Sequence, residues 1–230
     1  MTTELLGEDR TFGGNDLFVD LIPRSCWFSN VRTCILVSDW DKLRHYVYER
    51  VNYVCECCLI NTKETNENGN LEAHERWEYD DVNKIQTLKR IVALCHQCHQ
   101  TTHIGLAGIK GKKDEAVAHL KKVRNFTDDE CEIHIKNAFS LWSERNKYNW
   151  NLDLSLIENN NIKLSNKHKN KKGINSAINM PTKFYKTSEE AIIAHFLVEK
   201  KYALINGKKY TNLEEIMKLR DSDNVVDFTF

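Results

Sequence analysis

Apolar residues recur at helical spacing in several stretches of this 230-residue chain. Residues 38–51 begin with a pair that resembles a capping box, Ser38 and Asp41, and their apolar period predicts a helix with one buried face. That face consists of Trp40, Leu43, Val47 and Val51. Residues 110–125 predict a second, shorter helix.

A longer helix is predicted over residues 127–148, where Thr127 and Glu130 form a capping box. Similar helix starts occur at 187–190 and 211–214. The stripe that we expect to be buried on the 127–148 helix consists of Ile135, Ala138, Phe139 and Trp142.

Strand patterns are fewer. Residues 150–157 alternate apolar and polar side chains and predict a half-buried strand. The first 37 residues have no clear period, so we expect irregular structure with one short strand. Asn-Gly pairs at 68–69 and 206–207 favour tight hairpin turns.

Composition changes after residue 157. Residues 158–182 are poor in apolar side chains and rich in lysine and asparagine, which predicts a flexible linker. The sequence therefore predicts an α+β protein with a larger domain over 1–157, which includes N-terminal and helical extensions, and a small α+β module over 183–230.

Charge and hydropathy exclude some protein classes. Lysine plus arginine equals aspartate plus glutamate, at 33 each, so there is no net charge to attract a polyanion from a distance. No apolar run approaches the length of a bilayer, and the first residues lack the pattern of a signal peptide. We expect a cytoplasmic protein with no membrane partner.

Four of the eight cysteines form two Cys-x-x-Cys pairs, Cys55 with Cys58 and Cys95 with Cys98. A reducing cytoplasm favours metal binding over disulfides, and this spacing lets four thiolates reach one Zn²⁺ at about 2.3 Å. A four-thiolate zinc is coordinatively closed, so it stabilises the fold and does no chemistry. The remaining cysteines are interpreted as a spectator and small core residues: Cys57, Cys26, Cys34 and Cys131.

Three histidines, His96, His99 and His103, accompany the second cysteine pair. If a helix begins near Cys98, His99 and His103 lie one turn apart, about 5–6 Å between Cβ atoms, which suits a second metal ion. His96 points elsewhere. The alternative is that these are solvent-facing histidines beside a zinc knuckle.

The order of motifs over residues 53–104, Cys-x-x-Cys, LEAHERW and LCHQCHQTTH, resembles the HNH endonucleases, the ββα-metal or His-Me finger family. It resembles in particular poorly characterised HNH-like proteins of bacteria and their viruses. The resemblance implies a zinc-braced ββα-metal core that hydrolyses phosphodiester bonds of nucleic acid, first of all DNA, with Mg²⁺, Mn²⁺ or Ni²⁺. It implies that His74 is the general base and that His99 and His103 hold the catalytic ion.

Two positions depart from the family pattern. Ala73 stands where the family usually has a third metal ligand, and Arg90 stands near the asparagine that orients the base. Glu75 carries an oxygen donor that suits Mg²⁺ or Mn²⁺, and Arg90 is a candidate to stabilise charge on a phosphate. A surface ion pair is the alternative for each. Either the ion is held differently or the site is inactive.

Local charge favours a second class of function. Residues 51–104 contain more acids than bases, and the nearest cluster of cations lies downstream, at 110–124. The alternative is therefore a catalytically inactive, zinc-stapled scaffold that binds protein or nucleic acid, with residues 183–230 as the module that contacts a protein partner.

Overall fold

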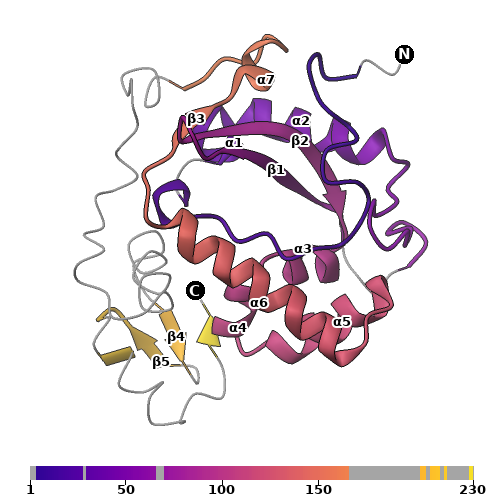
Figure 1. The fold of residues 1–230 in the computed structure, drawn as a ribbon. Helices are drawn as coiled ribbons and strands as arrows, with labels where there is room; N and C mark the ends of the chain where they lie inside the picture. The colour runs from indigo at the N-terminus through magenta and orange to yellow at the C-terminus, as the bar shows by residue number, and fades with distance from the viewer. Residues whose placement is uncertain are drawn as a thin grey trace.

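A computed structural model describes residues 4–27, 30–65, 70–165, 203–205, 208–212, 215–216 and 228–229, and all structural statements below concern these residues. The main body, up to residue 165, combines a small three-stranded sheet with helices, so the α+β class is confirmed. Figure 1 shows the sheet, with α1 and α2 near it and α3, α4 and α5 grouped beyond the end of β2.

The sheet has the order β1-β2-β3. Strands β1 (Glu72–Asp80) and β2 (Ile85–Leu94) are antiparallel, and β3 (Asn151–Asp153) pairs in parallel with the start of β2. The turn between β1 and β2 is tight because the Asp80 carboxylate accepts hydrogen bonds from the backbone N–H groups of Val82 and Asn83. Because β2 lies between the other two strands, β1 forms one edge of the sheet.

Within the described residues up to 165, eight helical segments pack around this sheet. Helix α6 runs across the front of the molecule in Figure 1. In chain order the segments are the 3-10 turn η1 (Arg24–Cys26) and the helices α1 (Val31–Cys34), α2 (Val37–Glu49), α3 (His96–Thr102), α4 (Ile104–Ile109), α5 (Lys113–Arg124), α6 (Asp128–Arg145) and α7 (Ser155–Glu158).

The helix predicted over 38–51 is confirmed as α2, with Trp40, Leu43 and Val47 buried. Its cap differs from the prediction: the helix begins after Leu36, which makes no side-chain capping bond. Helix α5 is also confirmed. A capping box at Thr127 starts α6 as predicted.

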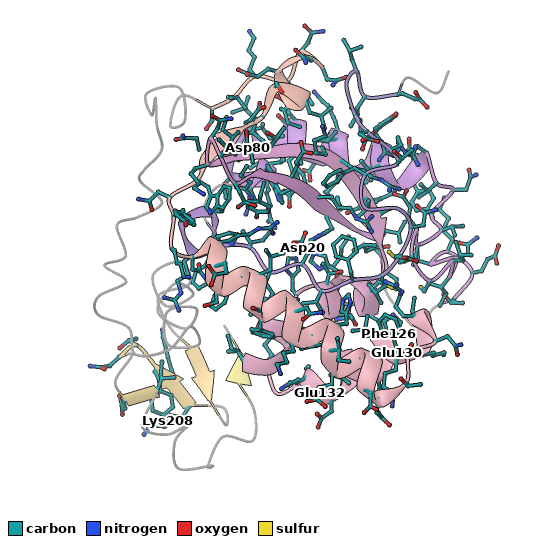
Figure 2. All side chains as sticks on the ribbon, viewed as in Figure 1. Asp20, Asp80, Phe126, Glu130, Glu132 and Lys208 are labelled. Atoms are coloured by element: carbon teal, nitrogen blue, oxygen red, sulfur yellow. The ribbon has the colours of Figure 1, made fainter. Side chains whose placement is uncertain are left out.

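The buried stripe predicted for α6 is confirmed only in part: Ile135 and Ala138 are partly buried and pack against the core. Cys131 is the buried residue of this helix, and Phe139 is 39% exposed. Helix α6 borders a cleft on the side that the apolar period predicted to face the core, so its aromatic side chains are only partly covered. Figure 2 shows Glu130 and Glu132 of this helix on the outside of the molecule.

Two strand predictions need correction. In the predicted strand 150–157 only Asn151–Asp153 is a strand, and the chain then turns into α7 because Asp153 accepts the Ser155 N–H at the helix start. Within the described part of residues 1–37 there is no strand; η1 and α1 are found there instead, with a single bridge from Ile35 to Leu164.

Near the C-terminus, β4 (Ala203–Ile205) pairs antiparallel with β5 (Lys208–Tyr210) and with β6 (Phe228–Thr229). The hairpin predicted at 206–207 is therefore confirmed. The helix predicted from 187, the turn at 68–69 and most of the predicted linker lie outside the described residues. Before that gap, Ile162 and Leu164 still pack against the core of the main body.

Candidate metal centre

The four predicted zinc cysteines form one cluster. Cys55 and Cys58 lie in the turn after α2, Cys95 is the N-cap of α3, and Cys98 lies in its first turn. Their sulfurs all lie within 4.8 Å of one another, and Cys58 Sγ is 3.6 Å from Cys95 Sγ. A tetrahedral site with Zn–S bonds of about 2.3 Å needs sulfurs about 3.8 Å apart, so the cluster fits a zinc ion.

The electrostatics of the cluster also fit a cation. Hydrogen bonds from Cys58, then Cys95 and Cys98, lower the pKa of the Cys55 thiol. The contacts that Cys95 and Cys98 each make with Cys55 raise the pKa of these two thiols. Four sulfurs at this distance cannot all carry negative charge without a positive ion among them. Four thiolates together therefore need the metal.

Sequence reasoning missed His119 of α5, whose Nε2 lies 3.2 Å from Cys98 Sγ. An imidazole N–H that donates to a zinc thiolate disperses its charge and holds it in place. Residues so far apart gave no local signal of this contact. The other cysteines lie outside the cluster: Cys57 contacts Arg76, and Cys26, Cys34 and Cys131 are buried.

A second cluster brings together His74 of β1, His99 of α3 and His103, which caps the end of α3. One ring nitrogen of each lies within 4.8 Å of the others, and the ring centroids are 4.7–5.5 Å apart. His74 is 3% exposed, and its Nε2 is buried with no hydrogen-bond partner. A buried nitrogen lone pair facing two other imidazoles fits a metal ion better than it fits an apolar core.

The pKa values in this cluster favour neutral rings. Burial, and then the charges of His103 and His99, lower the pKa of His74 well below its usual range. Burial, and then His99, lower the pKa of His103 to about 3. Neutral imidazole is the form that binds a metal, so His74 and His103 need lose no proton for binding near neutral pH.

Glu72, at the start of β1, orients His99 from outside the cluster. Its carboxylate lies 2.8 Å from Nδ1 of His99 and 2.8 Å from Nδ1 of the exposed His96. Burial opposes its ionisation, but the contacts with His99 and His96 outweigh burial and lower the pKa of Glu72 to about 2. Because Nδ1 of His99 is engaged, its Nε2 is left for the cluster.

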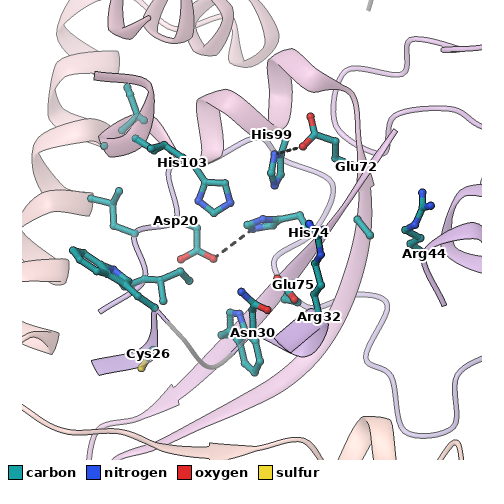
Figure 3. A pocket seen from close by; sticks show the side chains of 18 of the residues that line it. Asp20, Cys26, Asn30, Arg32, Arg44, Glu72, His74, Glu75, His99 and His103 are labelled. Atoms are coloured by element: carbon teal, nitrogen blue, oxygen red, sulfur yellow. Dashed lines mark hydrogen bonds and ion pairs between the residues drawn. The ribbon is translucent and has the colours of Figure 1, made fainter. Parts of the chain in front are cut away.

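Asp20 is the carboxylate that sequence reasoning missed. Its Oδ2 lies 4.0 Å from Nε2 of His74, and burial raises its pKa to about 6. The backbone N–H of Asp20 donates to the carbonyl of Thr102 at the end of α3, which fixes the loop beside the histidines. Figure 2 shows Asp20 between the sheet and α6, and Figure 3 shows its carboxylate pointing at His74. An isolated aspartate in an irregular segment gave no sequence signal.

The structure places the other predicted site residues apart from the three rings. Glu75 is the next residue of β1 after His74, but its carboxylate accepts the Val31 N–H at the start of α1 and burial raises its pKa. Arg90 of β2 is 1% exposed and lies 2.6 Å from Glu56, away from the cleft that the histidines line. Its role in the structure is that of a buried ion pair.

The histidine cluster lines a cleft of about 1050 Å³ between β1, α3, α4, α6 and the segment 20–27. Figure 3 shows His74, His99, His103 and Asp20 converging there, while the Glu75 carboxylate is bonded to the start of α1. The site is therefore recessed but open to a ligand.

Comparison with protein-family models, curated proteins and solved structures found no match to this chain. No helix among the described residues is long and apolar enough to cross a membrane.

Proposed function

We propose that this chain is an HNH-like, divalent-metal-dependent nuclease whose catalytic ion is held in the cleft by His74, His99 and His103. The observation that carries the proposal is the convergence of three imidazole nitrogens within 4.8 Å, one of them buried without a partner. The four-cysteine cluster supports it, because Cys95 and Cys98 hold the start of the helix that carries two of these histidines.

In this proposal each residue has one task. The resemblance assigns the general base to His74, but its position among the other two rings favours a role as third ligand, in the place left by Ala73. The task of taking a proton from water then passes to Asp20, 4.0 Å from His74, whose pKa of about 6 suits a base near neutral pH.

A bound divalent ion would supply Lewis-acid stabilisation of charge on the scissile phosphate. Glu72 holds His99 with Nε2 directed to the cluster. Arg90 takes no part in this scheme, since its guanidinium is bound to Glu56.

The test combines metal counting with a cleavage assay. Purified protein should contain one tightly bound zinc, take up a second divalent ion, and cleave nucleic acid with Mn²⁺, Mg²⁺ or Ni²⁺. His99→Ala should lose the second ion, and Asp20→Asn should keep it while cleavage falls about 10²- to 10⁴-fold. His45→Ala, which removes an exposed histidine of α2, is the matched control.

Two results would count against the proposal. A chain that binds only zinc and cleaves nothing would leave the zinc-stapled binding scaffold as the better account. If His74→Ala abolishes cleavage but retains the second ion, His74 is the base, as the resemblance implies, and Asp20 is not.

A further inference from the structure

We propose, resting on the nuclease function above, that the substrate is a single-stranded nucleic acid whose unpaired bases stack on an aromatic wall of the cleft. The aromatic wall consists of Trp27, Phe139 and Trp142, which line the same cleft as the three histidines. Duplex DNA is then a poor ligand of this site.

The aromatic wall is built from two segments that are fixed to each other. Trp27 follows η1, and both it and Trp142 of α6 donate their indole N–H to the carbonyl of Ile22, at 2.8 and 2.9 Å. Phe139 lies one turn before Trp142, with ring centroids 6.3 Å apart, and is 39% exposed. The Arg24 guanidinium lies over one face of Trp142, 5.3 Å from the ring centroid, so Trp142 has its other face for a ligand. Anchored rings that remain partly exposed offer apolar surface to a ligand at little cost in side-chain entropy.

The charges around the cleft favour few phosphate contacts. Arg32 and Lys113 line the cleft, and neither has a carboxylate partner among the residues that the structure describes. Arg44 also lines it but is paired with Asp41 at 2.8 Å. The lining includes four acidic side chains as well: Asp20, Asp41, Glu72 and Glu75. With two unpaired cations and four acids in its lining, the cleft can neutralise the few phosphates of a short single-stranded segment. It cannot neutralise the dense phosphate charge of a DNA duplex.

Access to the histidines points the same way. His74 is 3% exposed, so a scissile phosphate must descend into the cleft together with its neighbouring nucleotides. In a duplex each base is covered by the bases above and below it, whereas an unpaired base can give its π-face to an aromatic side chain. The aromatic wall and the recessed histidines can be used together only by a strand that is not paired.

Binding, not cleavage, tests this inference. The probe is a fluorescein-labelled single-stranded DNA oligonucleotide, compared by anisotropy with a duplex of the same sequence, with zinc-loaded protein, no added Mg²⁺ or Mn²⁺, and intact probe verified on a gel. We expect the single strand to bind at least about tenfold more tightly, and a salt slope near −1.4, for two phosphate contacts.

Variants of α6 supply the matched pair. Phe139→Ala should weaken single-strand binding about 5- to 150-fold, the range for loss of one base-stacking contact. Leu141→Ala removes an exposed side chain of the same helix that does not line the cleft, and should leave binding unchanged. Circular dichroism of both variants confirms that α6 is folded.

The results separate this inference from the nuclease proposal. Tighter single-strand binding that depends on Phe139 supports it even if no cleavage is detected. If the duplex binds as tightly as the single strand or more tightly, this inference is overturned, even if the protein proves to be a nuclease. The same holds if the Phe139→Ala and Leu141→Ala variants bind the single strand with equal affinity. Failure of both probes to bind overturns it too.

Discussion

The Glu72 carboxylate lies 2.8 Å from Nδ1 of His99. This contact engages Nδ1 and leaves Nε2 of the same ring for the histidine cluster. Such a carboxylate–histidine contact fixes the ring orientation of a metal ligand and raises its basicity. The strand β1 thus contributes to the histidine cluster twice, through His74 directly and through Glu72 by way of α3.

Replacing Glu72 should weaken metal binding without unfolding the protein. We expect Glu72→Ala to lower the affinity of the histidine site for Mn²⁺ about 10- to 100-fold, measured by calorimetry, because His99 is then free to rotate. Glu72→Gln retains an acceptor and should lose less. Glu78→Ala, an exposed position on the same strand, is the control. Equal effects of Glu72→Ala and Glu78→Ala would show that Glu72 does not orient His99.

Loss of one zinc cysteine should unfold the main body. Cys95→Ser removes a zinc ligand while leaving a good N-cap residue at the start of α3, so zinc content should fall from one ion per chain to none and the free energy of unfolding should drop by several kcal/mol. Elemental analysis and urea titration measure both. Cys57→Ser, whose sulfur lies outside the cluster, should keep its zinc. Retained zinc in the Cys95→Ser protein would contradict the four-thiolate site.

Arg90 should matter for stability and not for metal binding. Its guanidinium lies 2.6 Å from Glu56 in the interior, so Arg90→Met leaves a buried carboxylate with weaker pairing and should cost about 3–5 kcal/mol. Urea titration measures the loss. Lys89→Met, at a half-buried neighbouring position on β2, is the control. If Arg90→Met instead keeps its stability but abolishes cleavage, the catalytic assignment made from the sequence is correct.

His134 should make the attachment of α6 sensitive to acid. Its Nε2 accepts the Val19 N–H at 3.1 Å, and burial, with a smaller effect of Arg124, lowers its pKa. The unfolded chain then binds the proton at higher pH than the folded chain does. The stability that neutral His134 contributes is therefore fully present above the usual histidine pKa of about 6.5 and is lost as the pH falls below that value.

The measurement is the free energy of unfolding of the wild type and of His134→Gln, by urea titration at several values from about pH 7 to about pH 5. Gln retains an acceptor and does not titrate, so its advantage over the wild type should grow as the pH falls. His45→Gln on α2 serves as the control. Parallel curves for the wild type and His134→Gln would rule out this effect.

Much of the local structure could be predicted from the sequence. The capping box at Thr127 and the apolar period of α2 are local patterns, and they gave the correct helices. The stripe on α6 was predicted as buried because a period identifies a face but not what covers it. Phe139 borders a cleft, and only the tertiary arrangement of β1, α6 and the segment 20–27 creates that cleft.

The candidate site also combines features that the sequence determines with contacts that only the tertiary structure decides. Spacing within a few residues determined both cysteine pairs and placed His99 and His103 one helical turn apart, because zinc geometry and the helical repeat act over short stretches of chain. Tertiary structure alone decided that Asp20 reaches His74, that His119 reaches Cys98, and that Arg90 pairs with Glu56. Those contacts join segments 21 to 54 residues apart, and no local pattern encodes which distant side chains a fold will bring together.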